Sequence, residues 1–200
     1  IEDNIRLLKT KVDFVVLIAH AGIENIDFPI KEWRDKYKRF CAAGADIVVG
    51  HHPHVPQGYE IVNGKIIFYS LGNFYFDNEI FKNSSDDSFS VVLKFEKNKN
   101  IHFDIIYHKK FKGQTCMVEE SEVGFNIQKL NSYLQKDYEK NNIEISLKLF
   151  KEYYLNYYET ALGALPEKST FFQKVKFFIK SIIRKKEEKN LLLLLHNVRI

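Results

Sequence analysis

Two uninterrupted apolar runs separated by one helical segment constrain the fold more than any other feature of this sequence. Residues 13–19 (DFVVLIA) and 46–50 (DIVVG) resemble strands that are buried on both faces of a parallel sheet. Between them, residues 31–44 space their apolar side chains as a helix does; Pro29 can open this helix and Gly44 can end it. A strand, a helix and a strand in about 38 residues predict a right-handed βαβ unit and an α/β fold.

Further strand signals follow this unit. Residues 58–74 (GYEIVNGKIIFYSLGNF) predict a hairpin that turns at Asn63 and Gly64, because both residue types tolerate a positive φ. Two more strands are expected at 89–96 and 101–107, which places the end of the sheet-containing part near residue 112.

The last third of the chain has a helical composition. It is rich in Lys, Glu, Leu and Tyr, and its predicted helices lie near 126–140, 143–162 and 169–189. We therefore expect a sheet-containing region at 1–112 and a mainly helical region at 113–200.

Composition excludes several classes of protein. Hydrophobic residues make up 45% of the chain and charged residues 28%, values typical of a folded domain and not of a disordered one. The net charge of +4 is too small to indicate a nucleic-acid partner. Cys41 and Cys116 form no pattern and are expected to be free thiols.

The start of the chain carries no targeting signal. Residues 1–10 (IEDNIRLLKT) are polar, lack the apolar segment of a signal peptide and lack an initiating Met. They resemble the middle of a helix, so we expect that residue 1 is not the native start. Elsewhere, no apolar run approaches the ~20 residues that a transmembrane helix needs.

Histidines follow both strands of the predicted βαβ unit. His20 comes directly after the first strand, and residues 51–54 (HHPH) come after the second. Parallel strands joined by a helix have their carboxyl ends at the same edge of the sheet, where ligands commonly bind. His20 and the second group of histidines can therefore converge.

Spacing favours His52 and His54 within the second group. In extended backbone, side chains at i and i+2 point the same way, ~6.5–7 Å apart, and Pro53 disfavours helix at His52. His51 would then point to the other side. A single histidine at a strand end is usually a hydrogen-bonded surface residue, but three that converge suit a metal such as Zn. Spacing does not separate a three-histidine site from half of a larger site.

Three ordered blocks give the chain a family resemblance. HAGIE (20–24), GADIVVGHHPHVPQG (44–58) and IIFYSLGNFYFD (66–77) resemble the signatures of the CapA family of capsule and poly-γ-glutamate biosynthesis proteins. That family belongs to the calcineurin-like metallophosphoesterase superfamily. The resemblance covers roughly residues 10–108, and Ala21 stands where the family usually has Trp.

The resemblance implies a fold and a metal site. The fold would be part of a four-layer metallophosphoesterase-like α/β sandwich that holds two divalent ions, of Mn, Fe or Zn. His20 and His52 would bind one ion and His54 the other, with His51 at a variable place. Two such ions polarise a phosphoryl oxygen and generate a nucleophilic hydroxide.

The same resemblance implies that part of the site lies outside this sequence. The family's carboxylate ligands and its general-acid histidine belong to an earlier half, so no catalytic residue is assigned here. We expect the chain to be the C-terminal portion of a longer protein and to be inactive by itself.

Two more residues are candidates for supporting roles. Glu24 could orient a ligand, although a simple loop carboxylate is an equal alternative. Asn73 could face the same edge of the sheet, although a turn-stabilising role is slightly favoured. His102 and His108 are interpreted as structural.

Three functions stay open at this point. The first is a metal-dependent phosphoesterase-like protein that acts with the capsule or exopolymer assembly machinery or on its phosphorylated intermediates. The second is a non-catalytic scaffold of capsule assembly that keeps the fold. The third is an adaptor whose basic amphipathic segment 171–189 contacts an anionic membrane surface, although such a helix more commonly packs on its own protein. If the chain is like its family, it is associated with the cell envelope.

Overall fold

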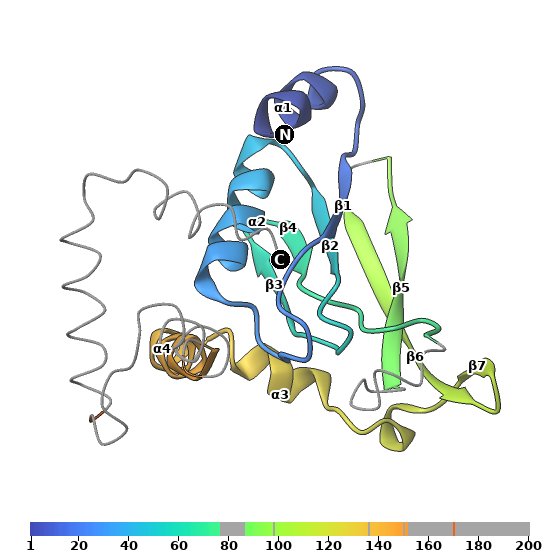
Figure 1. Cartoon of the computed structure of the whole chain (residues 1–200). Coiled ribbons are helices and arrows are strands. Elements are labelled where there is room, and N and C mark those ends of the chain that lie inside the picture. Colours follow the sequence, from blue (N-terminus) through green and yellow to red (C-terminus); the bar gives the residue numbers. More distant parts are fainter. Residues whose placement is uncertain (77–86, 98, 136, 150, 152–169, 171–200) are drawn as a thin grey trace. The chain divides into compact units, whose positions relative to one another are not determined.

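The structure is a computed structural model of the 200-residue chain (Figure 1). It describes residues 1–76, 87–97, 99–135, 137–149, 151 and 170. The chain divides into two compact units, residues 1–142 and 143–200. The sheets and the candidate site lie in the first unit.

The first sheet contains the predicted βαβ unit. Its strands, in spatial order, are β1 (Val16–His20), β2 (Ile47–His51), β4 (Lys65–Phe68) and β3 (Tyr59–Val62). β1, β2 and β4 are parallel, and β3 pairs with β4 as an antiparallel hairpin that turns at Asn63 and Gly64, as predicted. α2 (Lys31–Ala43) connects β1 to β2.

The second sheet is antiparallel and has the order β5, β6, β7. β5 spans Asp87–Phe95, β6 spans Ile101–Phe111, and β7 spans Gln114–Met117. The first two strands match the predicted ones, but β7 was not predicted. Gln114–Met117 contains one large apolar residue, so its sequence carries little strand signal, and its pairing with β6 defines it.

The two sheets enclose the main hydrophobic core. Ile47 and Val49 of β2 and Phe68 of β4 pack in one cluster with Phe89 of β5. Alternate residues of a strand point to opposite faces, so Val48, which is also fully buried, lies on the side of α2. A helix, a sheet and a second sheet thus form successive layers (Figure 1). The mixed α/β class is confirmed.

Three further helices are described, and the last of them crosses the boundary between the two units at residue 142. α1 spans Glu2–Lys9, α3 spans Ile127–Ser132, and α4 spans Tyr138–Leu149; a 3-10 turn covers Glu120–Glu122. The predicted helix at 126–140 is wrong as one element, because Asp137 has a φ of 56°, a left-handed conformation that no α-helix continues through. Most of the predicted helix 143–162, and all of 171–189, lie outside the described residues.

A buried carboxylate fixes the strands below the site. Asp46 lies just before β2 and accepts hydrogen bonds from the Val15 N–H (2.8 Å), Lys9 Nζ (2.6 Å) and Lys65 Nζ (2.5 Å). Burial of the Asp46 carboxyl opposes its ionisation, but these donors outweigh that effect and lower its pKa. Asp46 therefore ties α1, the start of β1 and the start of β4 together.

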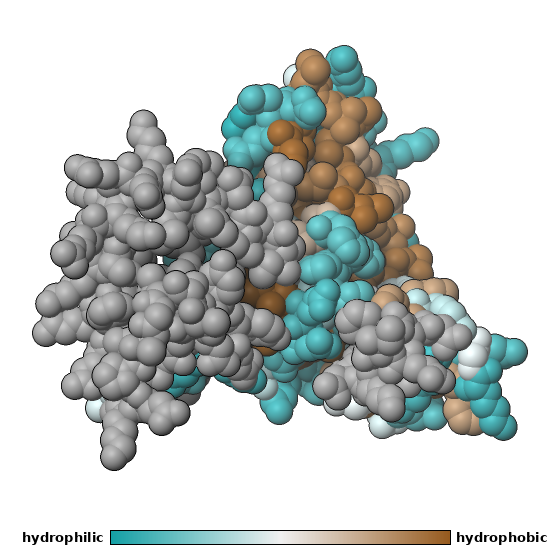
Figure 2. Space-filling model, viewed as in Figure 1, coloured by the Kyte–Doolittle hydropathy of each residue, from teal (hydrophilic) through white to brown (hydrophobic). Residues whose placement is uncertain are grey.

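β1 is the edge of its sheet and is poorly covered. Val16 is 40% exposed and Ile18 is 74% exposed, and Figure 2 shows a broad apolar area over α1 and the neighbouring strands. Within the described part of the chain, no helix is both long and apolar enough to cross a bilayer. Both cysteines are free thiols, as expected.

Candidate metal centre

The carboxyl ends of β1 and β2 bring the predicted histidines together. His20 lies opposite His51 in the parallel register, and the Ala21 N–H donates to the His51 carbonyl oxygen at 2.9 Å, which continues the pairing past both strands. His20 Nε2 lies 3.3 Å from His52 Nδ1. The ring centroids of His52 and His54 are 5.8 Å apart. The convergence expected from the βαβ topology is therefore observed.

The backbone that achieves this convergence is not the expected one. An extended His52-Pro53-His54 segment was predicted, but His52 has a φ of 103° and His54 a φ of 63°. Pro53 is buried, and its carbonyl oxygen accepts a hydrogen bond from the Asn25 N–H at 2.8 Å. The chain folds inward at Pro53 to make this contact, and the two flanking histidines take up the left-handed conformations that the turn requires. Unusual backbone of this kind is common at functional sites.

Glu24 joins the cluster from the loop after β1. One carboxylate oxygen of Glu24 and one ring nitrogen each of His52 and His54 lie within 4.8 Å of one another. Sequence reasoning gave Glu24 only an orienting role. Asn25, which follows it with a φ of 59°, bends the loop back toward Pro53. The sequence signal for this turn was Asn25 after Glu24, because asparagine tolerates a positive φ and can turn the loop so that Glu24 faces the histidines.

The nitrogen separation fits shared coordination. Two nitrogens at 2.0–2.1 Å from one tetrahedral ion are about 3.3–3.4 Å apart, which matches the separation of His20 Nε2 and His52 Nδ1. Among the residues that the structure describes, His52 Nε2 is a buried polar atom without a hydrogen-bond partner. This atom is the other nitrogen of the ring whose Nδ1 faces His20, so it is a separate donor and not part of the pair described above. The donor set of imidazoles and a carboxylate suits Zn or Mn.

Asn73 contacts His54 directly. Asn73 Oδ1 lies 2.8 Å from His54 Nδ1. An amide oxygen only accepts hydrogen bonds, so Nδ1 of His54 carries the proton and Nε2 keeps its lone pair for a ligand. Metal-binding histidines are commonly held in this way by a second partner. The contact supports the orienting role for Asn73 over the turn-stabilising one.

Burial and neighbouring charges favour the neutral form of the His52 imidazole. Burial lowers the pKa of His52, and the nearby His20 lowers it further, while the Glu24 carboxylate acts in the opposite sense. Burial and His20 lower the pKa of His51 in the same way. Because a histidine binds a metal in its neutral form, these shifts favour coordination.

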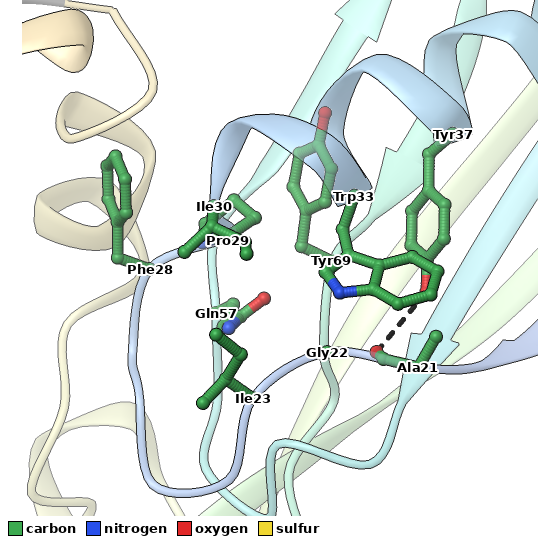
Figure 3. A pocket seen from close by; sticks show the side chains of 10 residues that line it. All are labelled: Ala21, Gly22, Ile23, Phe28, Pro29, Ile30, Trp33, Tyr37, Gln57 and Tyr69. Atoms are coloured by element: carbon green, nitrogen blue, oxygen red, sulfur yellow. Dashed lines mark hydrogen bonds between the residues drawn. The ribbon is translucent and has the colours of Figure 1, made fainter. Parts of the chain in front are cut away.

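A small apolar hollow beside the cluster supports the loop that carries Glu24. Figure 3 shows this hollow, about 250 Å³ counted with its open mouth, between the loop after β1 and the start of α2. Tyr37 OH donates to the Ala21 carbonyl oxygen at 3.4 Å (Figure 3). Gln57 Nε2 donates to the Ile26 carbonyl oxygen at 2.7 Å. The remaining lining is mostly apolar: Gly22, Ile23, Phe28, Pro29, Ile30, Trp33 and Tyr69. The apolar side chains of the hollow therefore pack against the loop after β1 and hold it in place.

Part of this chain is similar to known proteins of bacterial capsule synthesis. Residues 1–78 match the family described as bacterial capsule synthesis protein PGA_cap. The PGA biosynthesis protein CapA of Bacillus subtilis (strain 168) is 41% identical over 97 residues, which are 48% of this chain and 25% of that protein. The capsule biosynthesis protein CapA of Bacillus anthracis is 48% identical over 69 residues, 34% of this chain and 17% of that protein.

These matches confirm the predicted resemblance to the CapA family over the part of the chain that they cover. The family match includes both loops of the candidate centre, since His20, Glu24, His52 and His54 all lie within residues 1–78. The chain spans no more than about a quarter of the length of the relatives named here.

Proposed function

We propose that His20, His52 and His54, with the Glu24 carboxylate beside them, bind divalent metal ions at the carboxyl edge of the first sheet. The observation that carries this proposal is the 3.3 Å approach of His20 Nε2 to His52 Nδ1, a separation suited to one shared ion. His54, oriented by Asn73, would serve a second ion. The ions would be Mn, Fe or Zn.

The chemistry that fits this centre is phosphoester hydrolysis. Two divalent ions would supply Lewis acids for a phosphoryl group when they are bound. The residues of this chain contribute imidazole donors, a carboxylate and a loop that the Asn25 N–H ties to the Pro53 carbonyl oxygen. Catalytic residues beyond these ligands are not assigned.

The biological setting comes from the relatives, which are named for PGA and capsule biosynthesis. We propose that this chain acts in capsule or poly-γ-glutamate biosynthesis, on phosphorylated intermediates or with the assembly machinery at the cell envelope. The sequence of layers from α2 through two sheets supports a place in a four-layer metallophosphoesterase-like sandwich.

Metal titration of the full chain tests the proposal. We expect the chain to bind Zn²⁺ or Mn²⁺ in isothermal titration calorimetry and to retain the metal in elemental analysis after gel filtration. Changing both His52→Ala and His54→Ala should weaken binding by more than about 100-fold, because loss of ligands costs more than loss of their supporting partners. His102→Ala is the matched control, since His102 is exposed on β6 away from the centre.

Two outcomes would contradict the proposal. Equal metal content in the double variant and the wild type would remove these histidines from the site. If the folded wild-type chain binds neither ion, the alternative function, a non-catalytic scaffold of capsule assembly, is favoured.

A further inference from the structure

A buried histidine on the second sheet lies at the centre of a hydrogen-bond chain that leads toward the candidate centre. His108 on β6 is 3% exposed and pairs across the sheet with Ser88 of β5. Its Nδ1 lies 2.7 Å from Ser88 Oγ, and its Nε2 lies 2.8 Å from Ser90 Oγ. Ser88 Oγ also lies 2.5 Å from the carbonyl oxygen of Asn73. Both nitrogens of this imidazole are therefore satisfied.

The protons in this chain have one consistent arrangement. The carbonyl oxygen of Asn73 only accepts, so the single proton of the Ser88 hydroxyl is donated to it. Ser88 Oγ must then accept from His108, which places a proton on Nδ1. Burial lowers the pKa of His108, so the ring is neutral and its Nε2 accepts from the Ser90 hydroxyl. His108 therefore carries its proton on Nδ1, and the Ser88 hydroxyl donates only to the Asn73 carbonyl oxygen.

We propose that His108 and Ser88 are positioning residues for the candidate metal centre, acting through Asn73 on His54. His108 holds the Ser88 hydroxyl, Ser88 holds the Asn73 main chain, and the Asn73 side chain fixes the tautomer of His54. This inference rests on the proposed function for its purpose, because a fixed His54 tautomer matters only if Nε2 binds a ligand.

The packing around Asn73 transmits this constraint. Gly72 has a φ of 80°, and a Cβ atom on it would lie 2.9 Å from Ser88 Cβ and 3.1 Å from Pro56 Cδ. The Phe89 N–H donates to the Leu71 carbonyl oxygen at 3.1 Å. The segment before Asn73 is thus confined between β5 and the loop that carries the histidines, so a change at Ser88 is passed to Asn73.

The tautomer of His54 in the metal-free chain is the direct readout. Two-bond ¹H–¹⁵N NMR spectra distinguish a proton on Nδ1 from one on Nε2. We expect wild-type His54 to carry its proton on Nδ1. Ser88→Ala should give a mixture of tautomers, and Ser132→Ala, which removes an exposed hydroxyl on α3, should give the wild-type spectrum.

Zn²⁺ affinity is the second readout. Ser88→Ala and His108→Phe should each weaken binding roughly tenfold, the lower end of the loss seen when a supporting partner is removed. If Ser88→Ala does not fold, Ser88→Cys replaces it, because the thiol has a similar shape but is a much weaker hydrogen-bond donor than the hydroxyl, so the same mixture of His54 tautomers is expected. Melting curves of each variant show which ones are folded.

The outcomes separate the two proposals. A wild-type His54 spectrum in a folded Ser88 variant would overturn the positioning role, whether or not the chain binds metal. Absence of Zn²⁺ binding by the wild type, together with the expected tautomer shift, would overturn the proposed function and leave the hydrogen-bond chain as a structural device.

Discussion

Gly22 lies against the ring of Pro53 so closely that a Cβ atom on Gly22 would come within 2.7 Å of Pro53 Cγ. Gly22 also has a φ of 142°, which side chains rarely adopt. The loop after β1 and the loop after β2 therefore pack through a residue without a side chain. This contact sets the distance between the two groups of histidines.

Substitution of Gly22 by alanine should damage this packing. We expect Gly22→Ala to lower the free energy of unfolding by roughly 2–5 kcal/mol, from backbone strain and from overpacking against Pro53. Gly64→Ala is the control, because Gly64 also has a positive φ (75°) but a Cβ atom there would meet nothing within 4 Å. Urea denaturation should show a smaller loss for Gly64→Ala, about 1–2 kcal/mol. If Gly22→Ala and Gly64→Ala lose the same unfolding free energy, Pro53 moves aside at little cost and the close contact does not fix the two loops.

Neutralising Glu24 tests whether its carboxylate is a ligand. Glu24→Gln removes the charge and keeps the shape, so Zn²⁺ affinity should fall about 10- to 100-fold. Glu32→Gln makes the same change on the exposed side of α2 and should bind like the wild type. Titration calorimetry compares the three proteins. Unchanged affinity in Glu24→Gln would assign Glu24 to the loop surface.

Asn73 should matter for metal affinity more than for stability. Asn73→Ala removes the oxygen that holds His54 Nδ1, and we expect a loss of about 10- to 100-fold in Zn²⁺ affinity. The melting temperature should change little, because Asn73 Nδ2 has no hydrogen-bond partner among the described residues and the main-chain contact with Ser88 is kept. Asn4→Ala, on the exposed part of α1, is the control. A large drop in melting temperature at constant affinity would contradict this expectation.

The Asp46 cluster predicts a loss of stability in acid. The folded-state pKa of Asp46 lies below its ordinary value of 3.8, so its ion pairs stabilise the fold fully above about pH 4 and lose that effect as the pH falls further. Asp46→Asn should lower the free energy of unfolding at pH 7 by about 1–3 kcal/mol, because Lys9 and Lys65 lose their charged partner. The difference from the wild type should shrink toward pH 3 in urea denaturation. If the difference in unfolding free energy between the two proteins does not depend on pH, the charge of Asp46 is not its cause.

The local pattern of the sequence determined the elements that position the site. The apolar runs at 13–19 and 46–50 and the helical spacing between them were enough to predict β1, α2 and β2. The burial on both faces that was expected of both strands holds for β2 but is wrong for β1, which lies at the sheet edge with Ile18 74% exposed. Parallel pairing then required His20 and the second group of histidines to meet. Zn or Mn ligation stays a prediction.

Only the tertiary structure decided how the side chains meet. His54 and Asn73 are 19 residues apart, and Ser88 and His108 are 20 apart, so no local pattern relates them. The positive φ of His52 accompanies two contacts of Pro53 with the loop after β1: its ring packs on Gly22, and its carbonyl oxygen accepts from the Asn25 N–H. Local sequence specifies where a strand begins and ends, whereas the direction of a hydrogen bond between two loops depends on how the layers beneath them pack.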